Sequence, residues 1–167
     1  MVAAQNLTEE SVVAEAAGGG KFQVRVDTGD HSFLMDEPVS HGGLSTGPNP
    51  FDLLEAALAG CTLMTLRLYA ERKGWALEGL RVHVTHRKGA AGERDRFERE
   101  LEFGDDVAVD VRDRLIEIAQ RCPVHLLLER GADVSVGIAH EELPTAVSDG
   151  LHAAEMEEAC GDAGQPF

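Results

Sequence analysis

Several features are scarce in this chain of 167 residues. Aromatic residues make up 5% of it, and no stretch approaches eighteen consecutive apolar residues. A bilayer-spanning helix needs about 20 predominantly apolar residues, so no membrane partner is expected. The first residues, MVAAQNLTEESVV, show no basic region followed by an apolar run, so no secretory signal is expected either. These absences together predict a cytoplasmic protein.

Cysteine is also rare, with three residues in the chain, and no CxxC pair occurs. This count does not suggest a disulfide scaffold in an intracellular protein. The missing CxxC spacing argues against both a zinc ribbon and a thioredoxin-type motif. Any chemistry of the thiols must therefore come from cysteines that lie far apart in the sequence.

Positive charge is the third shortage: 15 basic residues face 30 acidic ones, for a formal net charge of −15. Phosphate binding requires clustered Lys and Arg, which argues against nucleic acid as a partner. The hydrophobic content of 43% is ordinary for a globular protein. We expect a single domain over residues 1–144, followed by an acidic, flexible C-terminal tail over 145–167 that contains Cys160.

The first half of the chain is predicted to form short strands and one long helix. Alternating apolar residues, Phe22, Val24 and Val26 in the first case, predict strands over 21–27 and 31–38. The earlier stretch SVVAEA is either another strand or a frayed lead-in. Asn49 and Pro50 form a strong helix-start signal, and Gly74 a stop signal. The helix between them is apolar nearly all round, so it should be buried on most sides.

The second half continues with alternating strands and helices. Strands are predicted around 80–86 and 97–103, then an amphipathic helix over about 106–121 and a short helix from Pro123. The last predicted strand, ADVSVGIA, has Val134, Val136 and Ile138 on one face. This order of elements predicts an α+β domain built on antiparallel sheet.

The two cysteines of the folded region, Cys61 and Cys122, allow three interpretations. Cys61 lies on an apolar helix face, where a free cysteine is usually inert core. Cys122 precedes Pro123 at a helix N-terminus, where the dipole favours a thiolate, and a charged His125 would lower the thiol pKa further. A metal site could combine both thiols and His125 with a fourth ligand, for which the candidates are His31, His41 and His83. The residues alone leave core, metal and reactive-couple readings open.

The segments GPNPFDLLEAALAGCTLMTLRLYAERKGW, LEGLRVHVTH and RDRLIEIAQRCPVHLLLERG, with HSFLMDEPVSHGG upstream, resemble the OsmC/Ohr family. The resemblance covers roughly residues 21–140. It implies the OsmC-like fold, with antiparallel sheets around a long buried central helix, and an intertwined homodimer. It also implies that Cys61 and Cys122 come together as a thiol pair.

The chemistry that the resemblance implies is the reduction of organic hydroperoxides in oxidative and osmotic stress defence. Cys61 would be the peroxidatic thiol and Cys122 the resolving thiol, and an external dithiol, lipoyl groups in the best-known members, would reduce their disulfide. Neither a metal nor another cofactor is expected. The substrate pocket would be apolar, and its candidate lining residues are Phe51, Leu54, Leu58 and Met64.

One position departs from the family pattern. Efficient members carry a Glu ten residues before the first cysteine, paired with an activating Arg, and this chain has Phe51 there. Glu55, Arg25 and His125 are the candidate replacements. Without a compensating cation, burial raises a thiol pKa and slows the nucleophile. The alternative function is therefore a non-catalytic redox switch or a protein that binds a small apolar ligand.

Overall fold

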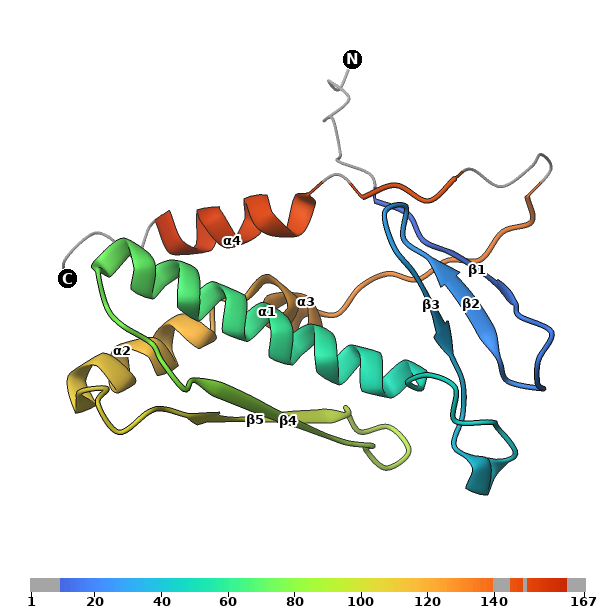
Figure 1. The fold of residues 1–167 in the computed structure, drawn as a ribbon, viewed down its shortest axis with the longest axis horizontal. Coiled ribbons are helices and arrows are strands. Elements are labelled where there is room, and N and C mark those ends of the chain that lie inside the picture. The colour runs from blue at the N-terminus through green and yellow to red at the C-terminus, as the bar shows by residue number, and fades with distance from the viewer. Residues whose placement is uncertain (1–9, 140–144, 149, 162–167) are drawn as a thin grey trace, which may run out of the picture. The chain divides into compact units, whose positions relative to one another are not determined.

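The computed structural model describes residues 10–139, 145–148 and 150–161. Its contacts divide the chain into two compact units. The first comprises the residues up to Pro50 together with Ser135–Leu151, and the second comprises Phe51–Val134 together with the residues from His152 onward. The elements in chain order (Figure 1) are β1 (Val13–Ala16), β2 (Val24–Asp27), β3 (Ser32–Met35), the 3-10 helix η1 (Val39–His41), α1 (Pro50–Lys73), β4 (Arg81–Arg87), β5 (Arg96–Glu102), α2 (Val109–Ala119), α3 (Pro123–Arg130) and α4 (Leu151–Gly161).

The first unit is an antiparallel sheet in the order β1-β2-β3. Both strands predicted before residue 38 are present, although β2 begins at Val24 and leaves Phe22 outside, and the stretch SVVAEA, left open from sequence, contains the strand β1. Val26, opposite Phe33 in the register, is the buried residue of the sheet. The β2–β3 turn is closed by the side chain of Asp27, which accepts a hydrogen bond from the Gly29 N–H at 2.8 Å.

A buried carboxylate organises the loop that follows β3. Asp36 is 2% exposed, and its oxygens accept hydrogen bonds from the N–H groups of Glu37, Leu44 and Thr46 and from the Thr46 hydroxyl. Burial alone would raise the pKa of Asp36, but these hydrogen bonds to the charged form hold the pKa below its ordinary value. The loop is therefore an ordered structure built around one ionised side chain.

The second unit is organised around α1, whose bounds agree with the sequence prediction. Pro50 occupies its start, and Gly74 after its last residue has a φ of +67°, the left-handed conformation that ends a helix. By length and composition α1 could cross a membrane, a test that core helices of soluble proteins also pass. Its buried residues form the stripe Leu58, Cys61, Thr62, Thr65, Leu66, Tyr69 and Ala70.

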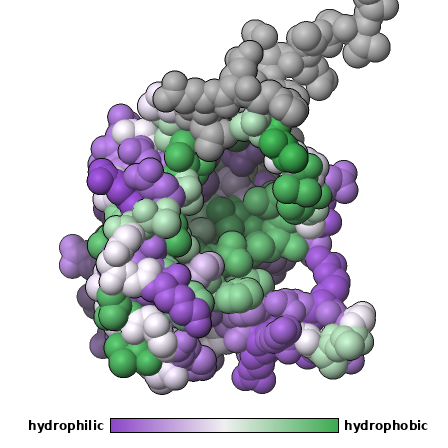
Figure 2. Space-filling view, turned by 90° about the vertical axis from the view of Figure 1, so that its right-hand side faces the viewer, coloured by the Kyte–Doolittle hydropathy of each residue, from purple (hydrophilic) through white to green (hydrophobic). Residues whose placement is uncertain are grey.

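The expectation that α1 is buried on most sides is wrong for the isolated chain. Phe51, Leu54 and Met64 are 52%, 44% and 54% exposed. One hairpin and three helices of the same unit cover only the buried stripe, so the remaining apolar positions of α1 lie open. Figure 2 shows that apolar side chains also reach the surface on the face that it presents.

The hairpin β4–β5 and the helices α2 and α3 complete the core around this stripe. The strands pair antiparallel from Arg81–Glu102 to Arg87–Arg96, as their alternating apolar residues predict. Leu115 and Ile118 of α2 are fully buried against Leu66 and Tyr69 of α1. The helix predicted over about 106–121 is shorter, since α2 spans Val109–Ala119.

Part of the segment expected to be a flexible tail is helical. α4 spans Leu151–Gly161, and α1 lies between α4 and the β4–β5 hairpin (Figure 1). Cys160 is 4% exposed, and its thiol approaches the Thr65 carbonyl at 3.7 Å, while Arg72 donates to the Glu157 carbonyl at 3.2 Å. Burial raises the pKa of the Cys160 thiol. The domain boundary at residue 144 stays a prediction.

The strand predicted for ADVSVGIA is not formed. Residues 131–139 have neither helical nor strand structure, and Val134, Val136 and Ile138 are 93%, 100% and 84% exposed. A strand exists only where another strand satisfies its backbone groups. Within residues 10–139, 145–148 and 150–161, no strand pairs with this segment.

Leu66 provides a test of the orientation of α1, because its side chain has no exposed surface. Leu66→Ala should lower the free energy of unfolding by about 2–5 kcal/mol, since the neighbours fill the resulting cavity only in part. The adjacent Arg67 is exposed, and Arg67→Ala should change the free energy of unfolding by less than about 0.5 kcal/mol. Urea unfolding followed by circular dichroism measures both, and equal losses would contradict this orientation.

Candidate functional site

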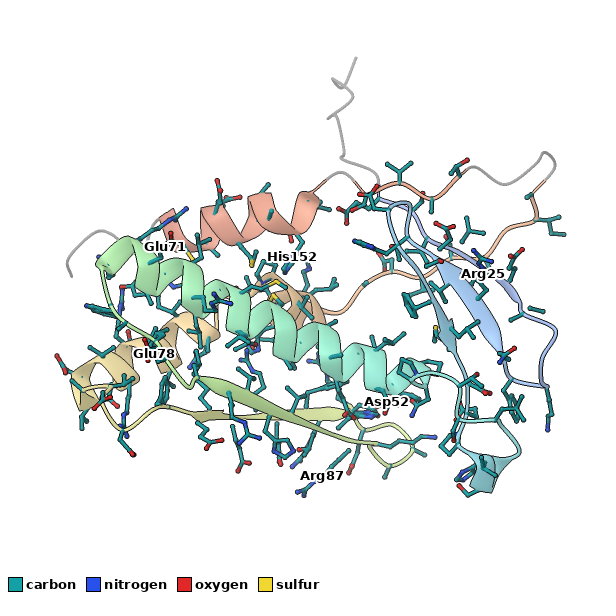
Figure 3. The ribbon with its side chains drawn as sticks, viewed as in Figure 1. Arg25, Asp52, Glu71, Glu78, Arg87 and His152 are labelled. Atoms are coloured by element: carbon teal, nitrogen blue, oxygen red, sulfur yellow. A yellow bond between two sulfur atoms is a disulfide. The ribbon has the colours of Figure 1, made fainter. Side chains whose placement is uncertain are left out.

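The structure brings Cys61 and Cys122 together as a disulfide, with their Cα atoms 6.1 Å apart (Figure 3). Cys61 comes from the buried stripe of α1, and Cys122 is the N-cap residue of α3. The two residues are 3% and 0% exposed. Pro123 causes this junction, because it cannot continue α2 but is well suited to the first position of α3.

The immediate surroundings of the two sulfurs are mostly apolar. Leu58, one turn before Cys61, is buried with them, and further hydrophobic side chains pack against this cluster: Val84, Phe97, Val124 and Leu128. Such a site excludes water, which raises the cost of forming a thiolate there. A nucleophilic thiol in this position therefore needs donors or a cation close by.

The first turn of α3 supplies one such donor. The Val124 N–H points at the Cys61 sulfur, with a nitrogen–sulfur distance of 3.5 Å. N–H groups at a helix start have no partner within the helix and carry its positive dipole end. From the sequence, this helix end was expected to lie beside Cys122. The structure shows that it also donates a hydrogen bond to the sulfur of Cys61.

A half-buried arginine that the sequence analysis missed supplies the cation. Arg99 of β5 donates to the Thr62 hydroxyl at 2.8 Å and to the Ala119 carbonyl at 2.9 Å, and a further nitrogen lies 3.0 Å from Nδ1 of His125. The pKa of Arg99 is lowered by burial. A signal was present, because Arg99 stands between Phe97 and Leu101 on the inward face of an alternating strand, where a charged residue breaks the pattern.

His125 lies in the same site but differs from the charged residue that the sequence analysis considered. Burial, and then the nearby Arg99 charge, lower the pKa of His125, while Glu129 at 3.6 Å opposes the shift. The imidazole is therefore neutral at neutral pH, with Nδ1 free to accept from Arg99. The positive charge of the site belongs to Arg99, whose three partners Thr62, Ala119 and His125 each lie within three positions of one of the cysteines.

A cavity of about 730 Å³ opens beside this cluster. Leu58, Phe97 and Leu128 form its apolar part, and Arg99 and His125 contribute polar groups, with charged residues of the β4–β5 loop around them. Because Leu58 contacts the cysteine pair as well, the cavity ends close to the two sulfurs. Seven of the ten lining residues are charged or polar, so the apolar pocket expected from the resemblance is not what these residues form, and an apolar body would contact only Leu58, Phe97 and Leu128.

The remaining candidate residues are dispersed. Leu58 lines the cavity, whereas Leu54 and Met64 are exposed on α1. Glu55 is six positions before Cys61, which places it roughly 120° away around the helix. Arg25 lies exposed on β2 in the first unit (Figure 3). The assigned roles of these residues stay predictions.

Phe51, at the position of the family's acidic residue, takes part in an aromatic stack. Its ring lies 4.9 Å from that of His86, which lies 4.6 Å from that of Phe97. Nε2 of His86 is also 2.8 Å from the Asp95 carboxylate. Since Phe97 lines the cavity, the stack joins the start of α1 to the cavity wall.

The metal interpretation has no geometric support. Among the residues whose structure is described, no three His, Cys, Asp or Glu side chains lie together as a set of metal ligands. Of the candidate ligands, Cys61, Cys122 and His125 belong to the site above, whereas His83 pairs with Glu100 on the exposed face of the hairpin. The site is thus best described as a buried cysteine pair with a half-buried arginine.

The protein has an α+β fold, and its long helix carries one member of a buried cysteine pair. These two features define its class. Residues 41–137 match the family model described as OsmC-like protein. Because this match covers more than half of the chain, the protein belongs to the OsmC-like family. The helix α4 lies beyond the matched residues.

Solved structures share the fold. The OsmC-like protein from Mycoplasma pneumoniae has a TM-score of 0.62 at 20% identity, over 73% of this chain and 88% of that chain. The organic hydroperoxide resistance protein OsmC from Legionella pneumophila has a TM-score of 0.52 at 20% identity, over 73% and 91%. The organic hydroperoxide resistance protein OhrB of Bacillus subtilis has a TM-score of 0.51 at 22% identity, over 71% and 89%. At these identities the likeness establishes the fold alone. A search of curated proteins found no match.

The lowered pKa of His125 predicts a pH dependence of stability. Below its ordinary pKa of about 6.5, His125 is protonated in the unfolded chain but stays neutral in the folded chain. The free energy of unfolding therefore has its full value above that pH, and part of it is lost as the pH falls through the folded pKa. His125→Asn keeps an acceptor for Arg99 but cannot titrate. Urea unfolding at neutral and mildly acidic pH should show a smaller acid-induced loss in this variant, and an unchanged loss would contradict the assignment.

Proposed function

We propose that this protein is a cysteine-based peroxidase that reduces organic hydroperoxides. The observation that supports it most strongly is the buried Cys61–Cys122 pair, with the Val124 N–H on one sulfur and a cavity beside it. Membership in the OsmC-like family and a fold shared with hydroperoxide resistance proteins agree with this proposal. The protein would serve in oxidative or osmotic stress defence in the cytoplasm.

The reaction needs only the two thiols. The Cys61 thiolate attacks the distal oxygen of the hydroperoxide, the O–O bond breaks, and the departing alkoxide takes a proton and leaves as an alcohol. Cys61 is now a sulfenic acid. The Cys122 thiolate attacks this sulfur and displaces hydroxide, which is released as water, so a disulfide forms. An external dithiol, a lipoyl group in this proposal, then reduces the disulfide by exchange and is itself oxidised.

The structure supports the assignment of Cys61 as the attacking thiol. Leu58, one turn before it, contacts the pair and also lines the cavity, so a peroxide in the cavity would approach from the α1 side. Cys122 is fully buried at the start of α3, where it can reach Cys61 but has no surface of its own. The apolar wall formed by Leu58, Phe97 and Leu128 favours organic hydroperoxides over hydrogen peroxide.

The second candidate function is a redox switch or a binding site for a small apolar ligand. Both cysteines are almost inaccessible, and Phe51 replaces the acidic residue of the family pattern. In this role the pair would oxidise slowly, and the cavity would retain a ligand without turnover. The rate of oxidation separates the two functions.

We also propose that the protein is a homodimer. The apolar residues of α1 that the chain leaves exposed, and the alternating segment with Val134, Val136 and Ile138, need a partner surface. An extended segment with one apolar face pairs readily with the edge of a sheet, and a second copy supplies both surfaces at once.

Oxidation of the reduced protein tests the peroxidase. We expect cumene hydroperoxide to form the Cys61–Cys122 disulfide within seconds and faster than hydrogen peroxide does, as measured by quenched-flow intact mass and peptide mapping. Cys61→Ser should abolish the reaction, and Cys122→Ser should leave a trappable sulfenic acid. Cys160→Ser is the matched control and should react like the wild type. A rate no faster than that of free cysteine would favour the switch or ligand-binding function.

Light scattering after size-exclusion chromatography tests the homodimer. The wild type should elute with twice the mass of the chain, and Val136→Asp should shift it toward the monomer, because a charge replaces an apolar contact. Val109, 71% exposed at the start of α2, supplies the control Val109→Asp, which should leave the dimer intact. A monomeric wild type at micromolar concentration would contradict the proposal.

A further inference from the structure

Arg99 contacts three helices that hold the cysteine pair. On α1 it donates to Thr62, the residue after Cys61. Its second acceptor, the Ala119 carbonyl at the end of α2, also accepts the Cys122 N–H at 3.4 Å. Its third neighbour is His125 in the first turn of α3. One guanidinium thus links the segment of α1 that carries Cys61 to the end of α2 and the start of α3, which flank Cys122.

The charge of Arg99 has no anionic partner in the part of the chain that the structure describes. Its three neighbours are a hydroxyl, a carbonyl and an imidazole, and no Asp or Glu side chain among those residues forms an ion pair with it. A partly buried cation without a counter-ion is costly and increases the stability of any anion formed nearby. The carboxylates of Glu93, Asp95 and Glu129 line the cavity, and Glu129 pairs with His125 and not with Arg99. Within the apolar cluster around the sulfurs, the groups able to become anionic are the two thiols.

We propose that Arg99 is the positioning residue of the Cys61–Cys122 pair: it holds the two cysteine-bearing segments in register and favours the thiolate when the pair is reduced. Its consequence for the rate of peroxide reduction rests on the proposed function, whereas its effect on thiol ionisation does not. Arg99 acts through Thr62, Ala119 and His125. It lies on the strand β5, outside the family pattern described above, which consists of the cysteines and the acidic residue with its activating Arg.

A purely structural arginine in the same unit offers a matched comparison. Arg112 donates to the carbonyls of Val107, Gly104 and Asp105, so it also makes three hydrogen bonds to neutral acceptors. It secures the start of α2 and contacts neither cysteine segment. Arg112→Gln and Arg99→Gln therefore remove comparable sets of hydrogen bonds, and only Arg99→Gln removes the charge beside the thiols.

The experiment is a pH titration of thiolate ultraviolet absorbance in the full chain, taken as the difference between the reduced and the disulfide form of each variant. This difference cancels Cys160 and Tyr69, which are present in both forms. We expect Arg99→Gln to lower the thiolate fraction at neutral pH about tenfold, which corresponds to one pKa unit. Arg99→Lys keeps the charge but lacks the fork of donors, so it should fall between Arg99→Gln and the wild type. Arg112→Gln should titrate like the wild type.

A titration of Arg99→Gln that coincides with those of the wild type and Arg112→Gln would overturn the proposal, even if the variant is less stable. If Arg99→Gln does not fold, the titration of Arg99→Lys is the test. A thiolate fraction of Arg99→Lys equal to that of the wild type would then overturn the proposal. The proposed function fails separately: a wild type that oxidises no faster than free cysteine is not a peroxidase, whatever the titrations show.

Discussion

The contact between Cys61 on α1 and the first turn of α3 is the constraint on which the rest of the site depends. Pro123 ends one helix and starts the next, and this places the Val124 N–H and Cys122 against the buried stripe of α1. The apolar residues around the sulfurs keep water out, and the helix end replaces water as a donor. A polar site is thus built into an otherwise hydrophobic core.

Placing a guanidinium in this core has a cost that the surrounding backbone offsets. Arg99 has two firm acceptors, Thr62 and Ala119, and the neutral His125 accepts a third hydrogen bond. Thr62 in turn donates to the Leu58 carbonyl at 2.7 Å, so the network continues along α1 to the cavity wall. Buried polar groups are tolerated where they are satisfied in this way, and such networks fix a unique arrangement of the elements that they join.

Local signals predicted much of the fold. Pro50 and Gly74 set the bounds of α1, and alternation predicted the β4–β5 hairpin. The helix α4 escaped prediction because its many small or acidic residues give residues 151–161 no apolar stripe, although Cys160 is buried. The alternation around Val136 correctly marks a sheet-forming segment, but local sequence does not say whether the same chain holds a strand to pair with it.

The site could be predicted only in part for a related reason. Cys61 and Cys122 were found through spaced motifs, and Leu58 through its place one helical turn from Cys61. The role of Arg99 depends on which way β5 faces and on which helix ends meet there, and both are tertiary facts. Phe51 looked like a lost acidic residue, yet in the structure it stacks on His86 and supports the cavity wall.

The shortness of α3 has a consequence for the opening and closing of the disulfide. Helices of fewer than about 12 residues are marginal on their own, and α3 spans only Pro123–Arg130. It is held by the disulfide at its N-cap, by Arg99 at its first turn, and by Arg94, which donates to the carbonyls of Leu128 and Glu129 at its end. Opening the disulfide removes the only covalent link among these three and leaves α3 held by the two arginines and by the packing of Val124 and Leu128. Each oxidation or reduction of the cysteine pair therefore also changes the stability with which α3 is held against the rest of its unit.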